Sequence, residues 1–180
     1  RKIINYLANR SKLKRHLKKA IFLAKPIINV LGIKERRGLK EYDSHKESIV
    51  VVSHEASITG APILALNICK ELSKEFNVIS IILRNGELIS EFRKESVIVF
   101  EPLMGILVKS TIDKRIKTIC KGQKPKYAIV NSVVSAGAIQ PLRSIGIPVM
   151  VLIHEFGVYI RPLDIAETIG KWSNKLVFST

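Results

Sequence analysis

Short apolar runs alternate with stretches of helical periodicity along residues 49–180. The runs are apolar on both faces, and such strands alternating with helices indicate a mostly parallel sheet covered on two sides. Because crossovers between parallel strands are right-handed, we expect a Rossmann-like α/β fold. We expect strands at Ile49–Val52, Val78–Leu83, Val97–Phe100, Tyr127–Asn131, Val149–Ile153 and Leu176–Phe178, and helices at Ala61–Ser73, Leu88–Lys94, Thr111–Lys121, Ala136–Ile145 and Leu163–Lys171.

The first strand leads into a polar turn with the residues His54, Glu55, Ser57, Thr59 and Gly60. In open parallel sheets, ligands bind at the carboxyl ends of the strands, where this turn is expected to lie. Gly60 can adopt a positive φ and leaves room for a ligand oxygen near the backbone. The first amides of the next helix favour an anion, and Pro62 fits the first helical turn. A connecting turn without a ligand is the alternative.

Polar groups follow four of the expected strands. They are His54, Arg84-Asn85-Gly86, Asn131-Ser132 and His154-Glu155. Because the carboxyl ends of parallel strands meet at one edge of a sheet, we expect these groups to converge on one crevice.

The charge of the chain is unevenly distributed. The 180 residues carry a net charge of +15. Residues 1–48 hold 14 Lys or Arg and 4 Asp or Glu, a net charge of +10. Residues 49–180 hold 16 Lys or Arg and 11 Asp or Glu, a net charge of +5. This asymmetry argues against a nucleic-acid groove across the domain.

Cys69 and Cys120 lie apart within helical patterns, so we expect reduced thiols and a reducing compartment. No apolar run is long enough to span a bilayer.

The basic N-terminal region has the pattern of an amphipathic helix. Apolar residues recur every three or four positions between Leu13 and Leu31, and the cations Lys12, Lys14, Arg15, Lys18 and Lys19 occupy other positions. Such a helix can bind an anionic membrane surface; packing against its own domain, or against another partner, is the alternative. We therefore expect an arm at residues 1–33, a polar linker at 34–48 and the Rossmann-like domain at 49–180.

Several segments resemble a known family. The segments 54–62 (HEASITGAP), 83–88 (LRNGEL), 130–132 (VNS), 147–155 (IPVMVLIHE) and 174–179 (NKLVFS) follow the order found in the N-terminal domain of family 4 glycosyltransferases, which have the GT-B fold. The resemblance covers residues 49–180, and the ordered set of motifs is more specific than any one of them.

The resemblance implies retaining transfer of a sugar from a nucleotide-sugar donor, without a metal or other cofactor. In this family the N-terminal domain mainly binds the acceptor, and a second Rossmann-like domain holds the nucleotide. No such second domain follows in this sequence. The chain begins with Arg1 rather than Met and ends at Thr180 after an expected strand, so we expect a fragment of a longer protein with little activity alone.

The resemblance also implies residue roles. His154 matches a histidine at the donor sugar and is the expected catalytic residue, with a structural histidine as the alternative. Thr59, Gly60 and Ala61 match the loop near the donor diphosphate, although relatives often carry paired glycines there. The expected acceptor and sugar contacts are His54, Glu55, Ser57, Asn131, Ser132, Glu155 and Tyr159. Helix capping is the alternative for Ser57, Thr59, Asn131 and Ser132, and solvent exposure or loop packing for Glu155 and Tyr159.

Other functional classes find less support. The two His-Glu pairs suggest a metal site, but adjacent side chains in a strand point apart. The sequence has neither a G-x-S-x-G elbow nor a G-x-G-x-x-G turn. The remaining alternatives are a GT-B-fold sugar-nucleotide epimerase and a non-catalytic carbohydrate- or membrane-binding module. The leading hypothesis is a transferase for cell-surface polysaccharide, peripheral on the cytoplasmic face of the membrane. The sequence does not indicate the donor sugar, the nucleotide, the acceptor or the linkage.

Overall fold

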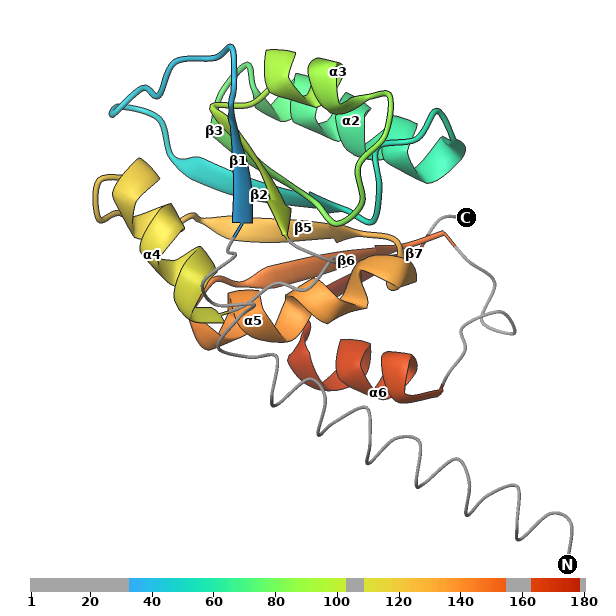
Figure 1. The fold of residues 1–180 in the computed structure, drawn as a ribbon. Coiled ribbons are helices and arrows are strands. Elements are labelled where there is room, and N and C mark those ends of the chain that lie inside the picture. Colours follow the sequence, from blue (N-terminus) through green and yellow to red (C-terminus); the bar gives the residue numbers. More distant parts are fainter. Residues whose placement is uncertain (1–32, 103–108, 155–162, 179–180) are drawn as a thin grey trace, which may run out of the picture. The chain divides into compact units, whose positions relative to one another are not determined.

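A seven-stranded, mostly parallel sheet organises the part of the chain that the computed structural model describes, namely residues 33–102, 109–154 and 163–178 (Figure 1). Its strands are β1 (Ile33–Arg37), β2 (Ser48–Ser53), β3 (Asn77–Ile82), β4 (Ile98–Pro102), β5 (Tyr127–Asn131), β6 (Val149–Ile153) and β7 (Lys175–Phe178). The expectations for the arm at residues 1–33, including its membrane-binding cations, fall almost entirely outside these residues.

The strands lie in the order β1-β4-β3-β2-β5-β6-β7, and β1 is antiparallel to its neighbour β4. The other pairs are parallel. Counted from β2, the parallel strands have the order 3-2-1-4-5-6, which is that of doubly wound, Rossmann-like folds. After β4 the chain crosses back to form β5 on the other side of β2, and the later strands are added in the opposite direction. The topological switch point therefore lies between β2 and β5. Ligands of such sheets bind at the carboxyl ends of the strands at this switch point.

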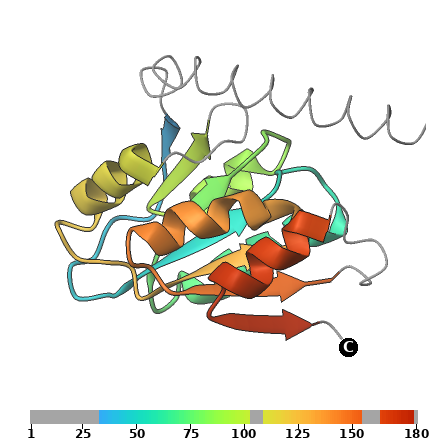
Figure 2. The same ribbon diagram turned by 90° about the horizontal axis from the view of Figure 1, so that it is seen from below.

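Helices cover both faces of the sheet (Figures 1 and 2). On one face lie α2 (Gly60–Leu72) and α3 (Ile89–Lys94), and on the other lie α4 (Lys109–Ile119), the 3₁₀ helix η2 (Val133–Ala138), α5 (Ile139–Ser144) and α6 (Leu163–Trp172). None of the helices among the described residues is both long enough and apolar enough to cross a membrane.

The unbroken apolar run of β2 follows from its position between the two layers. Ile49 and Val51 belong to the core under α2 and α3, whereas Val50 and Val52 belong to the core under α4, α5 and α6. All four side chains have no exposed surface. The α/β class and the parallel sheet are thus confirmed. The two cysteines are free and buried, and burial raises the pKa of Cys69 to about 12.

Most element boundaries differ from the expectation by one or two residues, and two differ by more. The expected linker at residues 34–48 is wrong in part, because Ile33–Arg37 forms the edge strand β1 and pairs with β4. Its side chains are mostly exposed and charged, so it lacks the apolar alternation of a covered strand. The helix expected at Ala136–Ile145 begins earlier, as a 3₁₀ helix at Val133. Ser132 determines this start, because its φ of 72° ends the strand and its Oγ accepts a hydrogen bond from the Val134 amide.

Candidate functional site

The loop between β2 and α2 holds a chain of polar contacts. Ser57 Oγ donates a hydrogen bond of 2.6 Å to Glu55 Oε1 and lies 2.9 Å from Thr59 Oγ1. His54 Nε2 lies 3.5 Å from the same Glu55 oxygen. The side chains of His54 and Glu55 are 17% and 26% exposed, so both are available at the surface but partly desolvated. These residues follow β2 and lie at the carboxyl edge of the sheet, as expected.

The environment keeps Glu55 ionised. The hydrogen bond from Ser57 lowers the pKa of Glu55; partial burial opposes this effect, and the charges of His54 and Arg84 lower the pKa further. Arg84 follows β3, the strand next to β2. Residues at two strand ends therefore act electrostatically on the Glu55 carboxylate. An ionised carboxylate accepts hydrogen bonds, and it can therefore bind hydroxyl groups.

Gly86 holds this loop in place. A Cβ atom built on Gly86 would overlap the carbonyl of Ala56, so any larger residue would push the two loops apart. The same Ala56 carbonyl accepts a hydrogen bond of 2.8 Å from the Leu88 amide, and the Ala56 side chain is fully buried. Ser53 Oγ closes the loop from the other side with a bond of 2.7 Å to the Glu55 carbonyl. The close approach of the two loops thus explains why position 86, in the segment 83–88, is a glycine.

The N-terminus of α2 is open. The helix begins at Gly60, one residue before the expected start, and Thr59 is its N-cap residue but makes no side-chain cap hydrogen bond. Gly60 does not use the positive φ that a glycine can adopt, because among the described glycines only Gly122 and Gly146 have one. Apart from its chain neighbours and the backbone of its own helix, no atom of the described residues lies within 4 Å of the point that a Gly60 Cβ would occupy. The expected space beside the first amides of α2 is therefore present. It exists because Gly60 has no side chain to fill it, and not because of a positive φ.

Asn131 connects three elements at the switch point. Its Nδ2 donates a hydrogen bond of 2.8 Å to the Ala61 carbonyl in the first turn of α2, and its Oδ1 lies 2.8 Å from His154 Nε2, just beyond β6. Asn131 ends β5 and has no exposed surface. Because Oδ1 can only accept, His154 Nε2 must carry the proton of this bond. The arrangement fixes the orientation of the imidazole ring.

Ser132 and Ser135 form the turn after β5. Ser132 Oγ accepts from the Val134 amide at 3.2 Å, which is the capping alternative for this residue. Ser135 Oγ donates a hydrogen bond of 2.7 Å to the Asn131 carbonyl. Both serines are buried, and the bond from Ser135 helps to hold the main chain of Asn131 in position.

The structure brings most of the expected residues to one edge. His54, Glu55, Ser57, Thr59, Gly60 and Ala61 lie at the end of β2, Asn131 and Ser132 at the end of β5, and His154 at the end of β6. Glu155 and Tyr159 lie outside the described residues. The sequence placed Arg84 at this edge but did not indicate that its charge lowers the pKa of Glu55. It also did not indicate the buried His54 Nδ1, for which the described residues provide no hydrogen-bond partner. Within the same part of the chain, no three His, Cys, Asp or Glu residues are grouped as metal ligands.

The sequence matches no protein-family model, and no curated protein is significantly similar to it. The edge must therefore be interpreted from its own chemistry. That chemistry consists of an open helix N-terminus, an oriented histidine and an ionised carboxylate at the switch point of a parallel sheet.

Proposed function

We propose that residues 49–180 form the acceptor-side domain of a retaining glycosyltransferase. The enzyme would move a sugar from a nucleotide-sugar donor to a cell-surface glycan or a lipid-linked acceptor. The observation that carries this proposal is the bridge formed by Asn131, which ties the open N-terminus of α2 to His154 at the switch point. A histidine and a helix N-terminus held together in this way suit a ligand with a sugar next to a phosphate.

The helix N-terminus would act on the leaving group. When the bond between the anomeric carbon and the diphosphate oxygen breaks, negative charge grows on the diphosphate. The amides of Gly60 and Ala61 and the dipole of α2 would stabilise that charge, and such an interaction strengthens as the bond breaks. His154, kept in one orientation by Asn131, would contact the donor sugar. An interaction that is stronger in the transition state than in the bound substrate raises kcat.

The loop after β2 would contact the acceptor. The Glu55 carboxylate would accept a hydrogen bond from an acceptor hydroxyl group, and the partly exposed His54 and Ser57 would orient the same sugar. Retaining transfer needs no dedicated base on this domain, so the lowered pKa of Glu55 agrees with the proposal. The nucleotide would be held by a second domain outside these residues, without a metal.

The test uses the full gene product that contains this chain. Membranes supply lipid-linked acceptors, and a panel of radiolabelled nucleotide sugars supplies donors. We expect one donor to label the membrane glycan with retention of the anomeric configuration, which NMR of the product determines. His154→Ala should lower kcat on the order of 100-fold, as removal of a transition-state contact does. The acceptor KM should change far less.

His45→Ala is the matched control. His45 is exposed and lies before β2, at the opposite edge of the sheet, so this variant should keep the wild-type rate. A wild-type rate for His154→Ala would remove His154 from the site. Wild-type protein that transfers no sugar from any donor would contradict the transferase itself.

A further inference from the structure

The positive charge of the domain is concentrated in one segment. Residues 109–126 hold seven Lys or Arg and one Asp, a net charge of +6. Residues 49–180 together carry a net charge of +5, so the rest of the domain is slightly acidic. The segment comprises α4 and the loop that leads to β5. This local excess of charge needs an explanation of its own.

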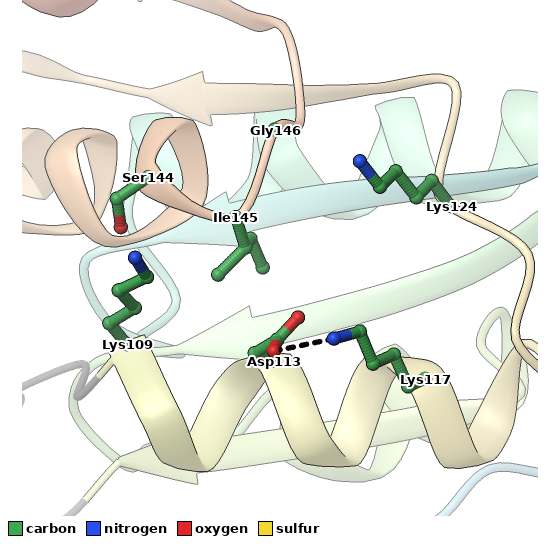
Figure 3. A pocket seen from close by; sticks show the side chains of 7 residues that line it. All are labelled: Lys109, Asp113, Lys117, Lys124, Ser144, Ile145 and Gly146. Atoms are coloured by element: carbon green, nitrogen blue, oxygen red, sulfur yellow. Dashed lines mark hydrogen bonds and ion pairs between the residues drawn. The ribbon is translucent and has the colours of Figure 1, made fainter.

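Part of this segment lines a groove of about 400 Å³. Lys109, Asp113 and Lys117 follow one another along one side of α4, and Ser144, Ile145 and Gly146 at the end of α5 lie opposite them, with Lys124 on the adjoining loop (Figure 3). Lys124 and Gly146 precede β5 and β6, so this end of the groove lies beside the strand beginnings, and none of the lining residues belongs to the candidate transfer site. Its volume falls in the range of small-molecule sites.

Most of the neighbouring cations of the segment have a partner. Outside the groove, three of the four do: Arg115 pairs with Glu35, Lys126 pairs with Glu47, and Lys121 lies over the ring of Tyr42. Inside it, Lys117 pairs with Asp113 at 2.8 Å. No acidic residue in the described part of the chain pairs with Lys109 or Lys124. Within the described residues, the groove therefore contains two ammonium groups without a carboxylate partner and a third that is paired with Asp113.

The position of Lys124 depends on Gly146. Its Nζ lies 3.0 Å from the point that a Cβ of residue 146 would occupy, and Gly146 has a φ of +84°. A side chain at position 146 would be strained by this φ and would displace the ammonium group. The turn after α5 thus leaves space for a cation at the rim of the groove.

We propose that this groove binds a phosphate-bearing ligand with at least two negative charges. Three lysines and one aspartate give the lining a net charge of +2, which a phosphate monoester of charge −1.5 to −2 would balance. Lysine ammonium groups bind phosphate as point charges. The described residues of the lining include no aromatic side chain on which a nucleobase would stack, which favours the phosphate itself as the recognised group.

The probe is inorganic pyrophosphate, added to the ¹⁵N-labelled full chain and followed by residue-resolved NMR. We expect saturable shifts at Lys109–Asp113 and Ser144–Gly146, weakened by NaCl because the charges are exposed. Lys109→Gln/Lys124→Gln should weaken binding roughly five-fold. The control Lys70→Gln/Lys175→Gln makes the same charge change at exposed positions on α2 and β7 and should leave the affinity unchanged.

Asp113→Asn provides an opposite test. It removes the carboxylate that competes for Lys117, so binding should become roughly two-fold tighter. Shifts absent from the groove, or equal affinities for the groove variant and its control, would overturn the proposal.

Vesicles of phosphatidylglycerol distinguish the sources of phosphate. Weaker vesicle binding of the groove variant than of its control would identify a lipid headgroup. Equal vesicle binding together with the pyrophosphate response would identify a soluble phosphate.

Discussion

The side chain of Asn131 uses both atoms of its amide group within the protein. Nδ2 bonds to the Ala61 carbonyl and Oδ1 to His154, and the residue is fully buried. Asn131→Ala removes two hydrogen bonds at once, so we expect a loss of about 1–3 kcal/mol in the free energy of unfolding. Urea denaturation measures this loss. Asn85→Ala, a change at an exposed residue, should cost less than about 0.5 kcal/mol. Equal stabilities of the two variants would contradict this role of Asn131.

The same bond predicts the tautomer of His154. Because Asn131 Oδ1 accepts the bond, neutral His154 should carry its proton on Nε2. Long-range ¹H–¹⁵N correlation spectra distinguish the two ring nitrogens. We expect the Nε2–H form in the wild type and a mixture of tautomers in Asn131→Ala. Protonation of Nδ1 in the wild-type protein would show that Asn131 does not orient the ring.

Ser57 controls the ionisation of Glu55. Its hydrogen bond is the largest of the effects that lower the pKa of this carboxyl group. A lowered pKa in the folded state stabilises the protein above the ordinary pKa of Glu, and this stabilisation is lost as the pH falls through the folded-state value. Ser57→Ala should therefore raise the pKa of Glu55 toward its ordinary value, as measured by ¹³C NMR of the carboxyl group. Thr59→Ala should change it less, because Thr59 contacts Ser57 and not Glu55. An unchanged pKa in Ser57→Ala would contradict this account.

At the scale of elements, the sequence predicts the strands that are covered on both faces. β2 and β5 pack between two layers, so their central residues Ile49–Val52 and Ala128–Val130 are all apolar and the pattern is plain. β1 is different, because only Ile33 is buried and the strand is joined to β4 through the main chain. Main-chain pairing leaves little mark on the side chains, and charged residues are common on edge strands. The sequence IKERR therefore resembles a linker.

The ends of the parallel strands were also predictable, and with them the edge at which the candidate residues meet. The contacts between those residues were not. The bond from Asn131 to the Ala61 carbonyl joins positions 70 residues apart, and its acceptor is a main-chain atom that any residue type would supply. The sequence therefore indicated that Asn131 lies near the site but did not show that its side chain is used within the protein.

The charged residues of β1 connect this strand to the rest of the sheet. Arg36 pairs with Glu101 of β4, whose side chain is only 10% exposed, and Glu35 pairs with Arg115 of α4. Arg36→Ala would leave the Glu101 carboxylate partly buried without its partner, so we expect a loss of about 2 kcal/mol in the free energy of unfolding. Lys74→Ala breaks an exposed pair with Glu71 and should cost less than about 1 kcal/mol. Urea denaturation of both variants gives the comparison, and equal costs would show that β1 does not depend on this pair.

At the scale of the whole molecule, the positive charge lies in two regions of the sequence. Residues 1–48 carry a net charge of +10, and residues 109–126 carry +6. The second region surrounds a groove, which suits a small phosphate-bearing ligand. The first contains an apolar repeat between Leu13 and Leu31, which suits a membrane surface because the apolar stripe can enter the interface. The two regions should therefore respond differently to substitution.

Vesicle binding of the full chain separates the two roles. Replacing Lys14, Arg15, Lys18 and Lys19 by Glu removes four cations and adds four anions, and each cation near an anionic surface contributes about 1 kcal/mol. We expect the partition onto phosphatidylglycerol vesicles to fall at least roughly 100-fold, while the pyrophosphate response of the groove stays unchanged. Glu at the exposed positions Lys40, Lys70, Lys171 and Lys175 makes the same change in net charge and should weaken vesicle binding far less. If both variants lost binding equally, net charge alone would hold the protein at the membrane. The amphipathic pattern of the N-terminal region would then have another purpose, such as packing within the protein.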